Sequence, residues 1–194
     1  MTDTSVVIAD DDAILRLDLR DLLQTMGYRV VGETSNARAA VDLARKLRPD
    51  LVIMDVRLPG SMDGIDAVAL LAAERIAPVL LLTGFSDADL AHRAAEAGAA
   101  GYVLKPFDED NLRPAIEIAL SRSRQIKGLE QKVTDLLEEL ETRKIIEHAK
   151  GMLMQEHALT ADEALNRMQK ASIDSHKTMR EVAEAIILAA NIGA

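Results

Sequence analysis

The chain has 194 residues, of which 48% are hydrophobic and only 2% aromatic, so aliphatic side chains must fill its core. It contains no cysteine, which excludes a disulfide framework, a thiolate zinc site and a thiol nucleophile. The net charge of −9 is concentrated in residues 1–121, which hold 12 Lys/Arg against 20 Asp/Glu, whereas residues 122–194 hold 11 against 12. The second part could therefore face an anionic partner if its cations share one side.

Membrane insertion and secretion are not indicated. No apolar stretch approaches the roughly 20 residues that a membrane helix needs, and no secretory signal opens the chain. We expect a soluble, cytoplasmic protein with no membrane partner.

Apolar strand-like runs alternate with segments of helical period in the first part of the chain. We predict strands at 6–9, 28–32, 51–54, 78–82 and 101–104, and helices at about 14–26, 37–47, 64–74 and 87–97. A further helix begins near Asp108. Five consecutive βα units predict an α/β fold, with a five-stranded doubly wound parallel sheet and helices on both faces.

Polar side chains follow four of these strands, and parallel strands bring such groups to one edge of a sheet. Carboxylates packed together repel one another unless a cation such as Mg²⁺, which prefers oxygen ligands, is present. With a lysine and a hydroxyl beside it, such a site suits phosphoryl transfer onto a carboxylate. The groups are Asp10, Asp11 and Asp12 after the first strand, Asp55 after the third, Thr83 after the fourth and Lys105 after the fifth. A simpler interpretation is also open, because Asp-Asp pairs often cap helices and Lys-Pro pairs often form turns; we expect Asp12 to be a cap.

The helix after Asp108 has no stop signal, and an apolar seam follows along it. The seam residues are spaced by three and four in turn, as in a coiled coil, and predict a connector over residues 122–142. Fewer than three heptads make a marginal pair, and the alternative is a helix that packs on its own chain. The seam consists of Ile126, Leu129, Val133, Leu136 and Leu140.

Residues 143–194 predict a small three-helix domain. The first helix continues to about His157, and the next two open with the capping boxes Thr160–Glu163 and Thr178–Glu181. No catalytic motif is present there, and we expect no enzyme. Gly151 lies inside a helix, which costs about 1 kcal/mol relative to alanine. Its missing side chain would admit either a crossing helix or a nucleic-acid backbone beside Lys150.

The set Asp10-Asp11, Asp55, Thr83, Tyr102 and Lys105-Pro106 resembles the flavodoxin-like receiver domain of two-component response regulators, over residues 1–121. The resemblance implies that Asp55 accepts a phosphoryl group from a sensor histidine kinase. It also implies a Mg²⁺ site made by Asp10, Asp11, Asp55 and the backbone carbonyl of Arg57, with Asp11 as a direct ligand. Thr83 and Lys105 would contact the phosphoryl oxygens, Tyr102 would turn inward on activation, and the Lys105–Pro106 bond would be cis. The loop Gly60-Ser61-Met62 is one residue longer than the common family pattern.

The second part resembles the ANTAR domain, on the stretches 143–154, 160–164, 171–172 and 177–183. That family binds RNA, which implies recognition of paired stem-loops in a leader transcript and transcription antitermination. Two such units joined by the seam would gain from effective concentration, so we expect a homodimer favoured by phosphorylation. The alternative is a helical protein-interaction output that does not bind nucleic acid. By position, RNA contact would fall to Arg143, Ala149, Lys150, Gly151, Arg167, Ser172, Lys177 and Arg180.

Overall fold

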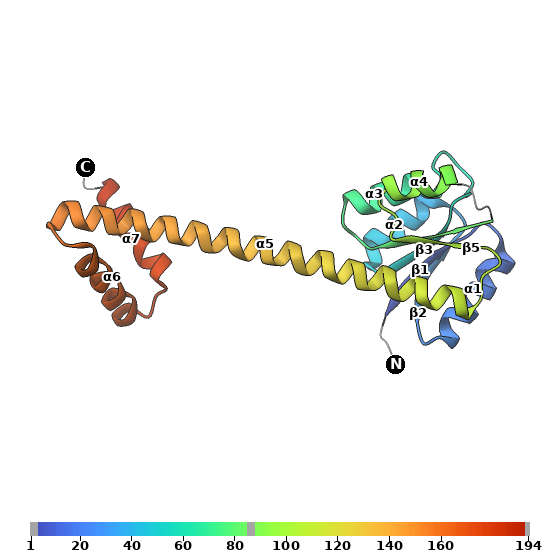
Figure 1. Cartoon of the computed structure of the whole chain (residues 1–194), viewed down its shortest axis with the longest axis horizontal. Coiled ribbons are helices and arrows are strands. Elements are labelled where there is room, and N and C mark those ends of the chain that lie inside the picture. The colour runs from blue at the N-terminus through green and yellow to red at the C-terminus, as the bar shows by residue number, and fades with distance from the viewer. Residues whose placement is uncertain (1–3, 85–87, 193–194) are drawn as a thin grey trace. The chain divides into compact units, whose positions relative to one another are not determined.

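The computed structural model describes residues 4–84 and 88–192 (Figure 1). The chain divides into two compact units, Met1–Lys127 and Gly128–Ala194. One helix, α5 (Glu109–His157), contributes residues to both units.

The first unit contains a five-stranded parallel sheet, as predicted, and its strand order is β2-β1-β3-β4-β5. Its strands are β1 (Ser5–Ala9), β2 (Arg29–Thr34), β3 (Leu51–Asp55), β4 (Val79–Thr83) and β5 (Gly101–Leu104). Its helices, besides the first part of α5, are α1 (Ala13–Thr25), α2 (Ala37–Leu47), α3 (Gly64–Ala73) and α4 (Ala88–Glu96). The predicted start of α4 at Asp87 lies outside the described residues.

Helices cover both faces of the sheet, as Figure 1 shows. Val52 and Met54 pack with α2, α3 and α4 on one face, whereas Leu51 and Ile53 pack with α1 and α5 on the other. All four of these β3 residues are fully buried. This confirms β3 as a central strand that is apolar on both sides.

Strand β2 differs from its prediction, because it begins one residue later and continues two residues past Gly32. Gly32 does not end the strand but pairs with Val7, and the ladder continues until Ala9 pairs with Thr34. The glycine makes room for packing, since a Cβ atom there would lie 3.1 Å from the Leu47 side chain.

The second unit is built by the end of α5 with α6 (Ala161–Ser175) and α7 (Met179–Ile192). Both predicted capping boxes are confirmed: Glu163 accepts from the backbone N–H of Thr160, and Glu181 accepts from that of Thr178. The core of this unit is small and consists of Ala149, Leu153, Ala164, Met168, Val182 and Ala183.

Helix α5 runs for 49 residues and does not break at 121 or at 142, where the sequence predicted domain limits. Pro114 lies in its second turn, where it lacks the N–H that would donate to the Asp110 carbonyl, and the helix continues past it. In the single chain the five seam residues are 55–63% exposed. Within the described residues, no helix combines the length and the apolar character that spanning a bilayer requires.

Candidate functional site

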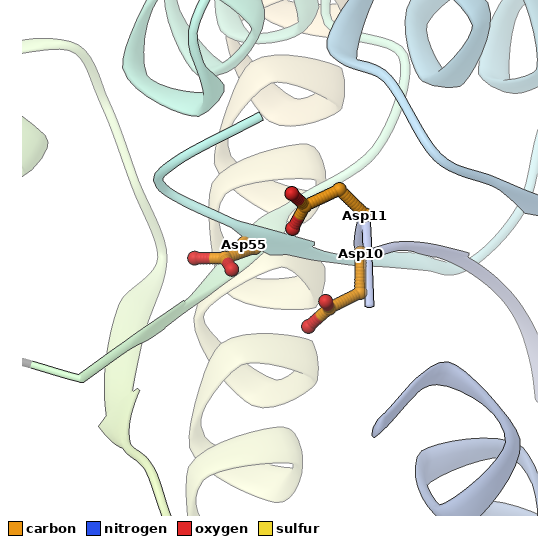
Figure 2. Close-up of side chains that lie close together, drawn as sticks. All are labelled: Asp10, Asp11 and Asp55. Carbon is orange, nitrogen blue, oxygen red and sulfur yellow. The ribbon is translucent and has the colours of Figure 1, made fainter. Parts of the chain in front are cut away.

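Three carboxylates meet where two neighbouring strands end. Asp10 follows β1, and Asp55 is the last residue of β3, which pairs directly with β1. One carboxylate oxygen from each of Asp10, Asp11 and Asp55 lies within 4.8 Å of the other two (Figure 2). This is the point of the sheet where the strand order reverses, the usual position of a ligand site in such folds.

Asp10 is 1% exposed, and each of its polar atoms takes part in a hydrogen bond. Its backbone N–H donates to the Thr34 carbonyl at 3.2 Å, and its own carbonyl accepts from Arg16 Nη1 at 2.5 Å. Its carboxylate accepts from the Asp12 N–H at 3.0 Å and from Lys105 Nζ at 2.7 Å. Asp12 itself caps α1, as predicted.

The side chains of Asp55 and Asp11 are progressively more exposed to solvent than that of Asp10. Asp55 has a side chain that is 13% exposed, and it accepts from the Arg57 N–H at 3.1 Å and from Lys105 Nζ at 2.7 Å. Asp11 is exposed, and in the described part of the chain its carboxylate has no hydrogen-bond or ion-pair partner. A set of three closely spaced carboxylates, one of them unengaged, fits the oxygen ligands that Mg²⁺ prefers.

Lys105 joins the two buried carboxylates, because its ammonium lies 2.7 Å from both Asp10 and Asp55. Burial alone would lower the pKa of Lys105, but its hydrogen bonds and charge interactions with the two carboxylates raise the pKa above its usual value. The residue therefore carries a fixed positive charge beside Asp55 at neutral pH.

The remaining predicted groups lie around the same edge. Thr83 ends β4 and is 5% exposed, and its carbonyl accepts from the Lys105 N–H at 2.7 Å. The Lys105–Pro106 bond is cis, as the resemblance implied. Tyr102 on β5 is 52% exposed, so its ring lies outside the core. Arg57 is exposed, two residues beyond β3.

Two residues that support this site were missed by sequence reasoning. Arg16 contacts the Asp10 carbonyl from α1. Gly64, the first residue of α3, packs so closely on β3 that an added Cβ would overlap the Asp55 carbonyl oxygen. The glycine directly after the capping residue Asp63 was the available signal for this close approach.

The residues predicted to contact RNA differ in how exposed they are to solvent. Arg143, Arg167 and Lys177 are exposed, and Arg180 pairs with Glu184 at 2.8 Å. Ala149 is fully buried in the core, so its methyl group does not reach the surface in this structure.

Two polar positions already have internal partners. Lys150 is 20% exposed and pairs with Glu147 at 2.5 Å. Ser172 donates to the Lys177 carbonyl at 2.5 Å and thereby fixes the turn between α6 and α7. Gly151 faces open space, since a Cβ there would meet no atom within 4 Å, so within the described chain no helix crosses at this position.

Comparisons with known proteins agree with this division of the chain. The family described as the response regulator receiver domain matches residues 6–117, and the ANTAR domain matches residues 134–187. Transcriptional regulatory protein PdtaR of Mycobacterium tuberculosis is 48% identical over 94% of this chain and 88% of its own length. Chemotaxis protein CheY of Thermotoga maritima is 34% identical over 57% of this chain and 92% of its own.

A solved receiver structure supports the same assignment. The signal receiver domain of a modulated diguanylate cyclase from Desulfovibrio desulfuricans G20 matches with a TM-score of 0.59 and 33% identity, covering 63% of this chain and 98% of that one. The family matches, the relative that spans nearly the whole chain and the parallel sheet lead to one conclusion. The chain belongs to the response regulators in which a receiver domain is followed by an ANTAR domain.

Proposed function

We propose that this protein is a cytoplasmic response regulator whose phosphorylation at Asp55 controls binding of its second unit to paired stem-loops in leader RNA, with antitermination as the result. The observation that carries the proposal is the cluster of Asp10, Asp11 and Asp55, here called the acid pocket, in one chain with an ANTAR domain. Lys105 bridges two of these carboxylates. The resemblance to a transcriptional regulatory protein over nearly the full length supports it.

In the receiver, Asp55 takes the phosphoryl group from a histidine of a sensor kinase. A carboxylate oxygen of Asp55 forms the new P–O bond while the P–N bond to the histidine breaks. Asp10, Asp11, Asp55 and the Arg57 carbonyl would hold Mg²⁺, which supplies charge neutralisation at the transferring group. Lys105 adds a fixed positive charge to the phosphoryl oxygens.

Thr83 and Tyr102 would report the phosphorylated state. Thr83 lies at the end of the strand next to Asp55, where its hydroxyl can donate to a phosphoryl oxygen. Movement of Thr83 toward that oxygen would open space that the exposed ring of Tyr102 fills by turning inward.

The link to the second unit is the exposed seam of α5, with a second copy of the chain as its partner. Five aliphatic residues on one helix face remain 55–63% exposed in the single chain. Burying them against the same face of another copy removes apolar surface from water, at about 25 cal/mol per Å². The seam is short, so a phosphorylated receiver can shift a marginal equilibrium.

The second unit would contact RNA through its exposed cations and the open surface beside Gly151. It has no aromatic residue, so unpaired bases must be read by hydrogen bonds and by stacking on arginine planes. Its net charge is close to zero, so one unit alone should bind weakly, and two units joined by the seam gain from effective concentration.

The test is binding to a two-hairpin leader RNA with and without a phosphoryl donor. We expect the donor to strengthen binding by the wild-type chain and to have no effect on Asp55→Ala. Wild-type binding that is identical under both conditions contradicts phosphorylation control. Wild-type protein that binds no RNA in either state contradicts the RNA output.

A protein-interaction output is the second candidate, because two large apolar residues of this unit, Ile173 and Leu188, are 72% and 61% exposed. Capture of a partner from RNase-treated lysate, together with no RNA binding by the purified chain, would favour it.

A further inference from the structure

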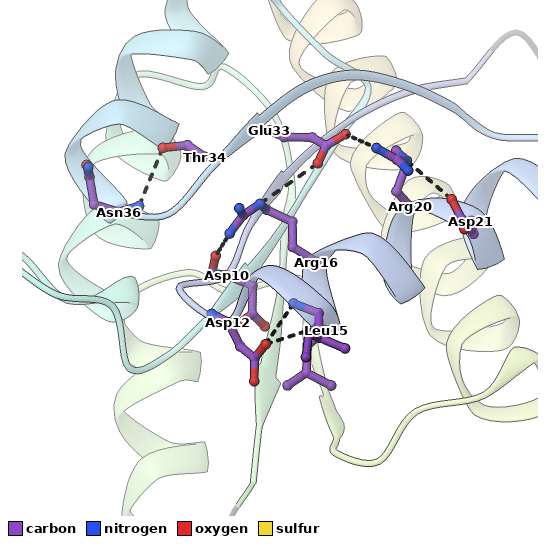
Figure 3. Close-up of polar contacts among 10 residues, drawn as sticks. Asp10, Asp12, Leu15, Arg16, Arg20, Asp21, Glu33, Thr34 and Asn36 are labelled. Carbon is purple, nitrogen blue, oxygen red and sulfur yellow. Dashed lines mark hydrogen bonds and ion pairs between the residues drawn. The ribbon is translucent and has the colours of Figure 1, made fainter.

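Among the hydrogen bonds of the described chain, one side chain from outside the acid pocket contacts the backbone of Asp10, the buried residue of that pocket. This side chain is Arg16 (Figure 3). It lies in the first turns of α1 and donates from Nη1 to the Asp10 carbonyl at 2.5 Å. Its side chain is only 21% exposed, so the guanidinium is held against the protein.

The guanidinium of Arg16 also interacts with a residue of strand β2. Arg16 Nε lies 3.9 Å from the carboxylate of Glu33 on β2, and Arg20, one helical turn later, approaches that carboxylate at 3.6 Å (Figure 3). Glu33 pairs in register with Ile8 of β1. The position of Arg16 is therefore set by α1 and by the strand beside β1.

The carbonyl that Arg16 contacts belongs to the peptide group joining Asp10 to Asp11. A peptide group is planar, so fixing its oxygen fixes the direction in which the next Cα leaves it. Asp11 has no side-chain partner of its own in the described chain, so its placement depends on this backbone. Asp10 is also fixed by Lys105, whereas Asp11 is not.

We propose that Arg16 is a positioning residue for the Mg²⁺ site, acting through the Asp10–Asp11 peptide to place the carboxylate of Asp11. This rests on the proposed function only in that the acid pocket binds Mg²⁺. Arg20 takes part in the same ion-pair network but does not contact Asp10, which makes it the matched control.

The experiment measures Mg²⁺ affinity of the full chain by calorimetry for Arg16→Met, Arg16→Lys and Arg20→Met, with thermal unfolding measured in parallel. Because partners beyond the direct ligands typically change metal affinity 10- to 100-fold, we expect Arg16→Met to weaken Mg²⁺ binding about tenfold. Arg16→Lys, which keeps one donor and the charge, should weaken it less, and Arg20→Met should leave it unchanged.

A second readout is the rate of Asp55 phosphorylation by a small-molecule donor as Mg²⁺ is varied. For Arg16→Met we expect a lower rate at limiting Mg²⁺ that recovers at saturating Mg²⁺. Equal Mg²⁺ affinities for Arg16→Met, Arg16→Lys and the wild type overturn the inference, and so does an equal loss in Arg16→Met and Arg20→Met. Absence of Mg²⁺ binding in the wild type contradicts the proposed function instead, so the two failures are distinguishable.

Discussion

At the scale of single residues, the position of Asp55 depends on a glycine nine residues further along the chain. The N–H of Gly64 donates to the Val56 carbonyl at 2.9 Å, and the close approach of α3 to the end of β3 leaves no space for a side chain. The same contact fixes the backbone that carries the proposed phosphoacceptor.

We therefore expect Gly64→Ala to destabilise the protein by about 1–3 kcal/mol, as overpacking of a filled site does, and to slow phosphorylation of Asp55. The matched control is Gly128→Ala, also in a helix but with open space at the Cβ, where alanine should stabilise by up to about 1 kcal/mol. Denaturant unfolding measures both changes. Equal stability of Gly64→Ala and the wild type would show that the backbone can move away at no cost.

Lys150 combines a candidate RNA contact with an existing ion pair to Glu147. If it contacts a phosphate, Lys150→Ala should weaken RNA binding about tenfold and reduce the log-log salt slope by roughly 0.7. Glu147→Gln removes the competing carboxylate, and since such pairs contribute only about 0.2–1 kcal/mol, binding should tighten about twofold. Titrations at several salt concentrations measure both effects, and an unchanged slope in Lys150→Ala would remove this residue from the interface.

Tyr28 provides a pH-dependent contact between the start of β2 and α5. Burial, together with a 2.8 Å hydrogen bond from its hydroxyl to Glu117, raises the pKa of Tyr28 from 10.0 to about 12. Because the folded-state pKa lies above the unfolded one, this contact stabilises fully below pH 10, and the stabilisation is lost as the pH rises toward 12.

The chain has only two tyrosines, so Tyr102→Phe isolates the titration of Tyr28. We expect the tyrosinate absorbance of that variant to rise with a midpoint near 12. Adding Glu117→Gln should bring the midpoint closer to the ordinary value. A midpoint near 10 in protein that circular dichroism shows to be folded would contradict the burial of this phenol.

At the scale of elements, the seam of α5 has the residue types of a parallel two-stranded coiled coil. Ile126, Val133 and Leu140 fall at a positions and Leu129 and Leu136 at d positions. Two of the three a residues are β-branched, and β-branched residues at a with leucine at d favour parallel dimers. In that arrangement Glu139 at g of one copy would face Lys144 at e of the other. Arg143 would take the next d position and end the seam, because two arginines would meet there.

The lack of cysteine makes this orientation directly testable. In a parallel pair, Leu140→Cys should form an interchain disulfide by itself on mild oxidation, and more of it in the presence of a phosphoryl donor. In an antiparallel pair, where a positions face d positions, it should crosslink only when mixed with Leu129→Cys. Glu138→Cys, on the opposite face of the helix, is the control and should not crosslink. Equal crosslinking of Leu140→Cys and Glu138→Cys would indicate random collision.

Secondary structure was the part most accessible to sequence reasoning, because its signals are local. Strands ending on Asp55 and Thr83, and caps at Thr160 and Thr178, follow from hydrophobic periodicity and capping chemistry. The continuation of β2 beyond Gly32 was missed, because a glycine inside a strand resembles a strand end until its partner strand is known.

The candidate site was predictable where topology alone brings residues together. Three carboxylates and Lys105 converge because β1, β3 and β5 are parallel strands of one sheet, so their carboxyl ends lie at the same edge. The locked state of Asp10 and the free state of Asp11 were not predictable, since they depend on how the Arg16 guanidinium and a single peptide group are oriented. The burial of Ala149 likewise depends on packing against α6 and α7.

At the scale of the whole molecule, the proposed switch needs no contact between receiver and RNA. In this proposal the receiver would change how often two chains are paired, and pairing would change how their two second units act together on RNA. Linking two weak sites can raise the overall affinity about 10²–10⁴-fold, provided that both can be engaged at once. The size of the effect therefore depends on the RNA as much as on the protein.

This predicts that a two-hairpin RNA and its two separate hairpins respond differently to phosphorylation. A phosphoryl donor should strengthen binding to a two-hairpin RNA by about tenfold or more, and leave binding to either hairpin alone nearly unchanged. The double variant Leu129→Glu/Leu136→Glu places negative charges on the seam of both copies, which then repel each other. It should abolish the effect of the donor on two-hairpin binding and keep single-hairpin binding. Filter binding on the three RNAs, with sedimentation to follow dimer formation, separates these effects. If phosphorylation strengthened single-hairpin binding equally, the signal would have to reach each RNA-binding unit within its own chain, and pairing through α5 would not be the switch.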